Sequence, residues 1–341
     1  MKKRKKIKQT DPIFQRIREV KTLLRLSKVS HYLKQISKIK QELPGRPVSY
    51  SNQSLILLYL VMRHKDFRSF RAFHTYLLEH KDIAQACGLE IIPCRHTLMR
   101  RMVQMYSIFV RLIVLIGRYF IQQNYCNAKE VGVDLKAFLC KQNKTRKPKR
   151  NKYNEQYTYF HTSKGLIWGV GLTAVITTTK NSIAFPILAQ THTAKRSTQK
   201  IFENMIYNLP EQTLRVLADS EYESSKVLRK IEKYDERGYL TRRAIIAPRD
   251  IKKMVDPLRK RNMAYFNSSR GQKKFDRRFP KVEGFFSGMI NHFNLRVLPK
   301  FYKKLALSFL LFFVFFYQSL VWTNIMQNSK HPCAVKHLIT H

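Results

Sequence analysis

Apolar residues recur every three to four positions along the first part of the chain, a spacing that predicts helices with one buried face. Ile13, Ile17 and Val20 mark this face before residues 44–47, where two prolines and a glycine end the pattern. Beyond the break, the pattern predicts helices that begin near Ser51 or Asn52 and near Ser69, a short piece that ends at Gly88, and a long helix over residues 95–122. The amino-terminal part of the chain is therefore predicted to be all helical.

The pattern changes at Glu130, from helical spacing to short apolar runs rich in β-branched and aromatic residues. A later helix begins near Pro280, with an apolar stripe that includes Val282, Phe285 and Met289. Three consecutive strands, followed by strands that alternate with helices, predict a mixed sheet with helices packed on it. The predicted strands are residues 131–139, 166–177, 182–188, 214–218 and 244–247, and the helices between them are residues 198–207 and 224–234.

These patterns divide the chain into four segments. The segments are a basic helical stretch at residues 1–43, a helical domain at residues 44–125, an α/β domain at residues 126–330, and a tail at residues 331–341. In the helical domain, several short helices precede a helix start that carries Arg95, His96, Arg100 and Arg101. This order is typical of a helix-turn-helix DNA reader, and a plain helical bundle with a basic, solvated face fits it equally well.

The longest apolar stretch runs from Leu305 to Trp322 and includes Ser308, Gln318 and Ser319. It is marginally short for a membrane span, which needs about 20 residues. We predict a buried helix that packs on the sheet or on a second subunit, and no association with a membrane.

The charge of the chain narrows its class of partner. The chain has 65 Lys and Arg against 22 Asp and Glu, a formal net charge of +43. Each basic side chain that pairs with a phosphate releases condensed counterions, so such a chain binds nucleic acid. Ribosomal proteins rarely combine this charge with so many aromatic residues, and an acidic membrane is normally met by one basic amphipathic helix. The five cysteines form no CxxC pair, which predicts reduced thiols and a cytoplasmic protein.

Three acidic residues stand out in so basic a chain, because each lies in or beside a buried segment. Asp134 lies inside a predicted strand, Asp219 ends another, and Glu283 borders the apolar stripe of the helix near Pro280. For any one of them, a salt bridge to a lysine is the ordinary explanation. Together they favour a metal site, because the ends of adjacent parallel strands meet at one edge of a sheet. Three carboxylates there suit two Mg²⁺ ions, which prefer oxygen ligands.

Blocks of sequence around these acids carry a resemblance to a known family. The blocks are Val131-Gly132-Val133-Asp134, residues 217–224 (LADSEYES) and residues 278–287 (RFPKVEGFFS), preceded in the helical domain by Gly45-Arg46-Pro47, Phe70-Arg71-Ala72-Phe73 and residues 92–98 (IPCRHTL). In order and surroundings they resemble the DDE transposases of bacterial insertion sequences, in the superfamily named for insertion sequences four and five. The resemblance covers most of the chain, and the blocks around Asp219 and Glu283 are its most specific parts.

The resemblance implies an α/β fold with an RNase H-like mixed sheet and flanking helices, preceded by an all-helical DNA-binding domain. It implies that Asp134, Asp219 and Glu283 are the catalytic residues and the ligands of two Mg²⁺ or Mn²⁺ ions. The implied reaction is DNA cleavage at transposon ends, followed by strand transfer into target DNA. The implied partner is double-stranded DNA, bound by a homodimer associated with the bacterial nucleoid.

DNA contacts are predicted at two kinds of position. The basic run at residues 141–152 follows the first catalytic strand, and Lys147, Lys149 and Arg150 are its expected phosphate contacts. A solvated loop fits the same run. The other predicted DNA contacts are Arg100 and Arg101 in the helical domain, and Tyr222, Arg278 and Lys281 beside the second and third catalytic blocks.

Two departures from the family pattern leave alternatives open. Leu135 and Lys136 follow Asp134, where the family often has a small or hydroxyl residue. Met289 and Ile290 stand where the family often has a lysine that touches DNA. One alternative is a catalytically inactive, transposase-derived DNA-binding protein, and another is an RNase H-like nuclease without joining activity.

Overall fold

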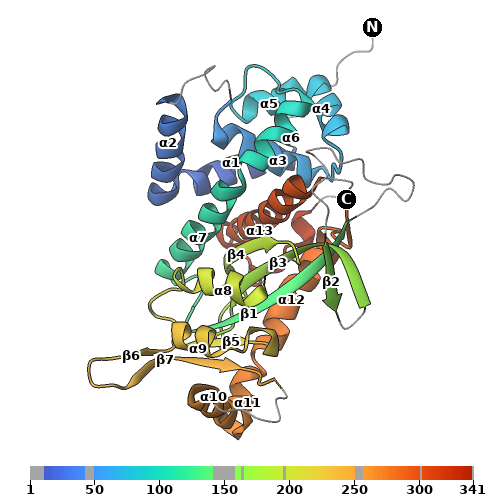
Figure 1. Cartoon of the computed structure of the whole chain (residues 1–341). Coiled ribbons are helices and arrows are strands. Elements are labelled where there is room, and N and C mark those ends of the chain that lie inside the picture. Colours follow the sequence, from blue (N-terminus) through green and yellow to red (C-terminus); the bar gives the residue numbers. More distant parts are fainter. Residues whose placement is uncertain are drawn as a thin grey trace. The chain divides into compact units, whose positions relative to one another are not determined.

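The structure is a computed structural model that describes residues 11–42, 50–140, 158–162, 165–194, 197–249, 256–299 and 302–339. The chain forms two compact units, residues 1–112 with 315–341 and residues 113–314. The boundaries between the units fall inside α7 (Tyr106–Gln122) and α13 (Lys303–Met326), which are labelled in Figure 1.

The first unit is all helical within its described residues, as predicted. Ser51 and Ser69 cap α3 and α4, because their side chains accept hydrogen bonds from backbone N–H groups of the first turn. Tyr59, which is fully buried on α3, donates a hydrogen bond of 2.8 Å to the Leu98 carbonyl of α6. The helices of this unit are α1 (Pro12–Leu24), α2 (Ser27–Glu42), α3 (Asn52–His64), α4 (Phe70–Glu79), α5 (Lys81–Ala86), α6 (Arg95–Gln104) and the short η2 (Lys336–Leu338), with parts of α7 and α13.

The long helix predicted over residues 95–122 is in fact two helices. α6 and α7 are bent by 57° relative to each other, at Met105. Met105 is fully buried and ends α6 at φ −86° and ψ 5°. No proline or glycine stands there, so the sequence carries no signal for the break.

The second unit is built on a mixed sheet. β1 pairs antiparallel with β3 and parallel with β5, and β5 pairs parallel with β7. The other edge of β3 pairs with β2 along its first half and with β4 along its second half. The central order β4-β3-β1-β5-β7 is RNase H-like, which confirms the predicted fold class. The strands are β1 (Glu130–Cys140), β2 (Thr158–Thr162), β3 (Gly165–Thr177), β4 (Pro186–His192), β5 (Arg215–Ala218), β6 (Lys233–Tyr234), β7 (Leu240–Ile246) and β8 (Val297–Leu298).

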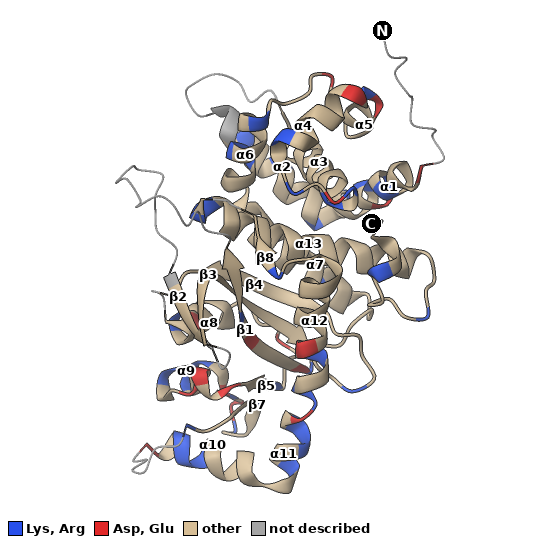
Figure 2. Ribbon diagram, turned by 90° about the vertical axis from the view of Figure 1, so that its right-hand side faces the viewer, with Lys and Arg blue, Asp and Glu red and all other residues tan. Residues whose placement is uncertain are grey.

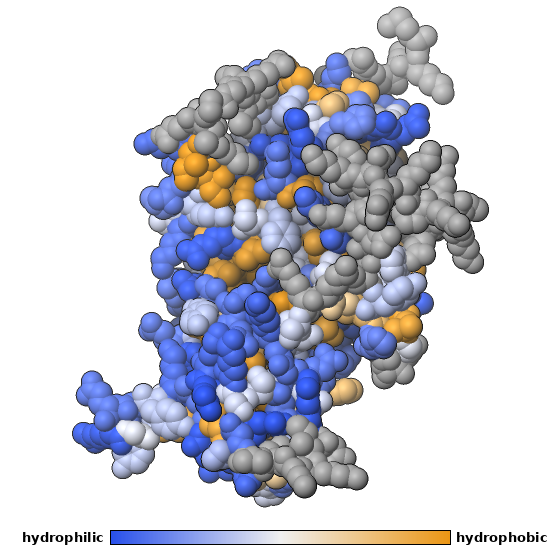
Figure 3. All heavy atoms as spheres, viewed as in Figure 1, coloured by the Kyte–Doolittle hydropathy of each residue, from blue (hydrophilic) through white to orange (hydrophobic). Residues whose placement is uncertain are grey.

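The helices of this unit flank the sheet, and α12 packs directly on β1. Figure 2 shows Lys and Arg on α9, α10 and α11, which follow β5 along the chain. Figure 3 shows that hydrophilic residues cover the β6–β7 hairpin on the face in view. The helices are α8 (Thr198–Ile206), the short η1 (Ser220–Tyr222), α9 (Ser225–Ile231), α10 (Pro257–Asn267), α11 (Ser269–Phe275) and α12 (Arg278–His292).

Several elements differ from their predicted positions. The strand predicted over residues 182–188 is β4, which begins at Pro186. Residues before it form a turn, because the Thr177 hydroxyl donates a hydrogen bond of 2.7 Å to the Ile183 carbonyl and accepts one of 2.9 Å from the Phe185 amide. The strands β2 and β6 and the helices α10 and α11 were not predicted, because their sequences lack a regular apolar pattern.

α13 is the buried helix predicted around Leu305 to Trp322. Among the described residues it is the one unbent helix with the length and composition of a membrane span, and 94% of its apolar window is buried inside the protein. In the second unit its first half packs on the sheet, where Thr191 of β4 donates a hydrogen bond of 3.0 Å to the Leu307 carbonyl. The prediction of a helix buried against the sheet is confirmed.

Candidate active site

Asp134 and Asp219, called the carboxylate pair below, lie side by side because of the register between β1 and β5. The last residues paired in this parallel ladder are Val133 and Ala218, so each carboxylate follows directly after the pairing ends. Neighbouring strands lie about 4.8 Å apart, so both residues lie close together at the end of the paired segments. The structure thus brings together two of the three predicted catalytic residues.

The guanidinium of Arg278 links the carboxylate pair. Its Nη2 lies 3.1 Å from Asp134 Oδ1 and 3.4 Å from Asp219 Oδ2. Its Nε donates a hydrogen bond of 3.2 Å to the Val133 carbonyl. Only 8% of the Arg278 side chain is exposed, and the residue begins α12. The start of this helix is therefore fixed to the point where β1 and β5 diverge.

Glu283, the third predicted catalytic residue, lies on α12 with an exposed side chain. Its negative charge is close enough to Asp134 to help raise the pKa of that carboxyl. Within the part of the chain that the structure describes, no three His, Cys, Asp or Glu side chains lie close enough together to hold a metal ion. Glu283 therefore stands near the carboxylate pair without completing a cluster of three.

Burial makes the Asp134 carboxyl harder to ionise than an ordinary aspartate. Burial raises the pKa of Asp134 to about 6, although Arg278 and a 2.8 Å hydrogen bond from the Leu135 amide act to lower it. The like charges of Asp219 and Glu283 add to the rise. One guanidinium therefore does not neutralise this site, and a further cation would stabilise the ionised form of Asp134.

Gly132 makes room for α12 against β1. A Cβ atom at this position would lie 2.7 Å from Val282 Cγ2, 2.9 Å from Thr178 Cγ2 and 3.2 Å from Arg278 Cγ. Two of these neighbours are on α12, so the glycine in the sequence Val-Gly-Val-Asp sets how closely Arg278 approaches the carboxylate pair.

We expect Gly132→Ala to lower the free energy of unfolding by about 1–3 kcal/mol, the usual cost of overpacking a core. Gly284→Ala, on the same helix, is the matched control, because a Cβ there meets nothing within 4 Å. This control should be neutral, or stabilising by up to about 1 kcal/mol through helix propensity. Urea unfolding of both variants measures the difference, and equal effects would show that Gly132 does not limit the approach of α12.

Glu130, at the start of β1, is a second buried carboxylate, and unlike Asp134 it is surrounded by several basic side chains. Its Oε1 accepts hydrogen bonds from Arg215 at 2.8 Å and Lys274 at 3.2 Å, and Arg277 lies 3.3 Å from its Oε2. Burial acts to raise the pKa of Glu130, but Lys274, Arg215 and Arg277 together bring it below the usual value. Glu130 is thus the centre of a structural salt-bridge cluster that joins β1, β5 and the approach to α12.

Glu223 fixes the loop that follows Asp219. Its fully buried side chain accepts hydrogen bonds from Arg259 Nε at 3.2 Å and Nη2 at 2.9 Å, and from the backbone N–H of Arg249 at 2.8 Å. The Arg249 side chain donates to two backbone carbonyls of η1, at 2.9 and 3.1 Å. These bonds hold η1 against α10 and the residues that follow β7, so Asp219 projects from a fixed loop.

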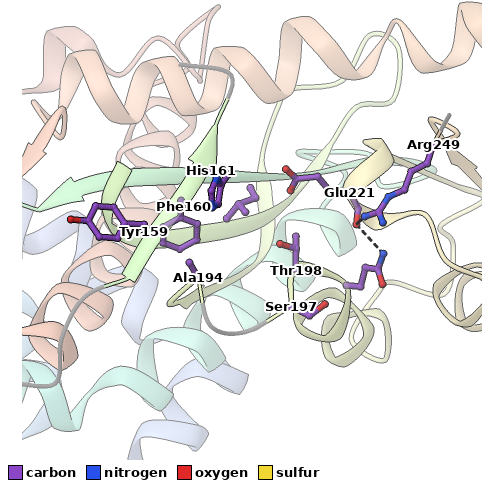
Figure 4. A pocket seen from close by; sticks show the side chains of 10 residues that line it. Tyr159, Phe160, His161, Ala194, Ser197, Thr198, Glu221 and Arg249 are labelled. Carbon is purple, nitrogen blue, oxygen red and sulfur yellow. Dashed lines mark hydrogen bonds between the residues drawn. The ribbon is translucent and has the colours of Figure 1, made fainter. Parts of the chain in front are cut away.

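A pocket of about 460 Å³ lies in the second unit, and its lining includes residues close in sequence to the carboxylate pair. Figure 4 shows the aromatic residues of β2 on one side of it, with Glu221, Arg249 and the start of α8 on the other. Two of its lining residues, Leu135 and Glu221, closely follow the carboxylate pair in sequence. The full lining is Leu135, Tyr159, Phe160, His161, Ala194, Ser197, Thr198, Gln199, Glu221 and Arg249.

In the helical domain, the structure places the two predicted DNA contacts differently. Arg100 is exposed on α6, as are Arg95 and His96. Arg101 is buried, and its Nη2 donates a hydrogen bond of 2.8 Å to Asn52 Oδ1. Arg100 therefore stays a predicted DNA contact, whereas the buried Arg101 packs inside the helical unit.

Near the carboxylate pair, the predicted DNA contacts are engaged within the protein. Tyr222 is fully buried, and its ring packs edge-on against Phe202 with the ring centroids 5.3 Å apart. Lys281 donates hydrogen bonds to two backbone carbonyls between β3 and β4. Arg278 is bound to the carboxylate pair, as described above. Lys147, Lys149 and Arg150 lie outside the described residues.

Sequence reasoning missed Glu130 and Glu223. Glu130 directly precedes the apolar start of β1, which is the same signal that singled out Asp134, whereas Glu223 lies in the polar stretch of residues 220–225 and carries no such signal. Their basic partners are distant in sequence, at Lys274 and Arg259 for example, and no local pattern reveals such pairs. Only the fold distinguishes these salt-bridged acids from the carboxylate pair.

The fold and the site together define an RNase H-like domain with two carboxylates, bridged by an arginine, where two parallel strands diverge.

The sequence matches no protein-family model and no curated protein. Among solved structures, the chain is similar to the cryo-EM structure of the piggyBac transposase synaptic complex with hairpin DNA. The identity is 11% and the TM-score 0.42, over 97% of this chain and 76% of that one. It is also similar to the Mos1 transposase paired-end complex with left transposon end, at 11% identity and a TM-score of 0.20, over 91% of this chain and 92% of that one. Both TM-scores are low, so neither likeness defines the function of this chain.

Proposed function

We propose that this chain is a DNA transposase, which cuts DNA at transposon ends and joins them to target DNA with the help of divalent metal ions. The observation that carries the proposal is the carboxylate pair, bridged by the first residue of the helix that bears Glu283. An RNase H-like sheet that presents these acids at diverging strands supports the same class. The proposed catalytic residues are Asp134, Asp219 and Glu283.

The carboxylate pair fits a hard divalent cation. Its oxygens converge on one positively charged nitrogen, at 3.1 and 3.4 Å, so their position already suits a cation. Mg²⁺ is commonly bound by one or two carboxylates together with substrate phosphates. Asp134 and Asp219 would therefore hold Mg²⁺ or Mn²⁺, with Glu283 supplying a third carboxylate once it draws nearer. When bound, the metal supplies an activated water and stabilises the leaving oxygen.

The chain's own residues have to bring a phosphodiester to this acidic point. Exposed Arg95 and Arg100 on α6 supply positive charge in the first unit, and α9, α10 and α11 supply it in the second (Figure 2). Each phosphate they neutralise adds affinity through counterion release. The pocket lined by Leu135, Glu221 and Arg249 offers room for the strand that continues from the cleaved bond.

The test is an assay with the purified chain, Mg²⁺ or Mn²⁺, and a plasmid that carries any inverted repeats found beside its gene. The proposal expects both cut ends and strand-transfer products. Cleavage without joined products would select a nuclease of the same fold.

An inactive DNA-binding protein is the second candidate. It is favoured by the Arg278 bridge and by the lack of a three-carboxylate cluster within the described ranges. Met289, where the family often has a lysine, is fully buried and offers DNA no contact. Specific binding to the repeats without any cleavage would select this candidate.

The basic run at residues 141–152 lies outside the described residues, and we expect it to bind DNA phosphates. Neutralising Lys147, Lys149 and Arg150 together should weaken DNA binding and reduce the slope of log affinity against log salt by about 0.9 for each lost phosphate contact. The matched control is neutralisation of Lys28, Lys34 and Lys38, which are exposed on α2 and remove the same charge. An equal change of slope in both triple variants would mean that the binding is diffuse.

A further inference from the structure

One nitrogen atom of Arg278 stands where the oxygens of the carboxylate pair converge. Nη2 lies 3.1 Å from Asp134 Oδ1 and 3.4 Å from Asp219 Oδ2, and both contacts are charge-assisted. A cation that bound both of these oxygens would need the space that Nη2 fills. The guanidinium and such a cation therefore compete for the same two atoms.

Arg278 is fixed in this place by more than the acids. Its Nε donates a hydrogen bond of 3.2 Å to the Val133 carbonyl, and its guanidinium lies 5.7 Å from the ring centroid of Phe275. Its side chain is 8% exposed, whereas that of the neighbouring Arg277 is 36% exposed. A planar guanidinium with several donors suits this arrangement, since it can bind two carboxylates and a carbonyl at once. Arg278 is a built part of the site.

We propose that Arg278 is an internal counter-cation, which holds the carboxylate pair together in the metal-free protein and is displaced when a divalent cation binds. The proposal rests on the metal site of the proposed function. Without a positive charge between them, two adjacent carboxylates repel each other, and Arg278 removes much of that cost. The same contacts oppose metal binding, because each must be lost before the cation can take its place.

Displacement also gives Arg278 a second partner. A guanidinium released beside the carboxylate pair is within reach of a DNA phosphate bound there, and phosphate is a partner that arginine binds in bidentate fashion. DNA should therefore raise the affinity for the metal, and the metal should raise the affinity for DNA by the same factor. The predicted DNA contact at Arg278 then belongs to the metal-bound state.

The test is titration of the purified full-length protein with Mn²⁺, without DNA, by calorimetry. Arg278→Gln should bind Mn²⁺ about tenfold more tightly than the wild type, within the usual range for coupled binding events. The matched control is Arg277→Gln, which removes the same charge one residue away and contacts Glu130 instead of the carboxylate pair. This control should change the Mn²⁺ affinity by less than about twofold, because Arg277 pairs with Glu130 and its half-exposed charge is screened by solvent from the carboxylate pair. Asp219→Asn should lose most of the binding, which shows that the signal comes from the carboxylate pair.

Equal or weaker Mn²⁺ binding by Arg278→Gln overturns the proposal, because Arg278 would then support the metal site and not compete for it. Arg278→Lys serves if the Gln variant does not fold. Its shorter side chain keeps the charge but cannot hold both acids and the Val133 carbonyl. A Lys variant that binds Mn²⁺ no more tightly than the wild type overturns the proposal equally.

A further measurement separates this proposal from the proposed function. Tighter Mn²⁺ binding by Arg278→Gln, in a protein that never cleaves DNA, would leave the counter-cation role standing and remove the transposase. If the wild type cleaves DNA, but the wild type and Arg278→Gln bind Mn²⁺ equally well, the transposase stands and the counter-cation role is removed.

Discussion

Asp134→Asn, Asp219→Asn and Glu283→Gln should each lower the rate of DNA cleavage in Mg²⁺ by more than about 100-fold, since loss of even an outer partner of a metal site costs 10- to 100-fold. Each substitution removes an anionic oxygen that a hard cation requires. DNA binding in EDTA should survive in all three variants. Because phosphate is repelled by this negative charge when no metal is present, the affinity should be equal to that of the wild type or higher.

Asp276→Asn is the control for these three substitutions. Asp276 is exposed just before α12, so its removal changes the net charge near the site without touching the carboxylate pair. Cleavage and binding should both stay near the wild-type level. Any of the three site variants that folds and still cleaves at such a rate does not belong to the catalytic site.

Neutralising two acids on the same strand should change the stability of the protein in opposite directions. Glu130→Gln should lower the free energy of unfolding by about 3 kcal/mol, because it leaves Arg215, Lys274 and Arg277 without the buried charge that pairs them. Asp134→Asn should raise it by about 3 kcal/mol in the metal-free protein, because the pKa of Asp134 is raised from 3.8 to about 6 and each unit of pKa shift corresponds to about 1.4 kcal/mol. Urea unfolding in EDTA at about pH 7.5 measures both changes.

The pH dependence of the Asp134 effect gives its own check. The pKa of Asp134 is raised to about 6, so the folded state binds its proton more tightly than the unfolded state does. Ionised Asp134 therefore costs stability above pH 6, and this cost disappears as the pH falls from 6 towards the ordinary value of 3.8. The advantage of Asp134→Asn should shrink over the same range. If instead Asp134→Asn destabilises the protein at neutral pH, Asp134 is an ordinary salt-bridge partner of Arg278.

Much of the fold follows from local sequence pattern. The apolar stripes predict α1, α3 and α12, and the change of pattern at Glu130 marks the start of the mixed sheet. The break at Met105 was not predictable, because a fully buried methionine there carries no turn signal. The helices α10 and α11 were not predictable either. Each is largely exposed and has no apolar stripe, so the sequence shows no helical pattern there.

The candidate site was predictable in its acids but not in their partners. Asp134 and Asp219 end up adjacent because each follows the last pair of a parallel ladder, and an apolar strand that ends in an acid is visible in the sequence. Arg278 and Arg277 look alike in the sequence, yet one binds the carboxylate pair and the other binds Glu130. Which arginine takes which acid is decided by how closely α12 approaches β1 at Gly132, and no local pattern encodes that distance.

The Arg278 bridge also sets an order of events during synthesis of the chain. Arg278 contacts Val133, which precedes it by 145 residues, and Asp219, which precedes it by 59. At a synthesis rate of about 5–20 residues per second, β1 is made roughly 7–30 s before its arginine is made. Both acids are therefore made before the guanidinium that bridges them, and the bridge can form only after α12 has been made. Until then no arginine lies between the two acids, and a cation from the cell would meet no competitor there.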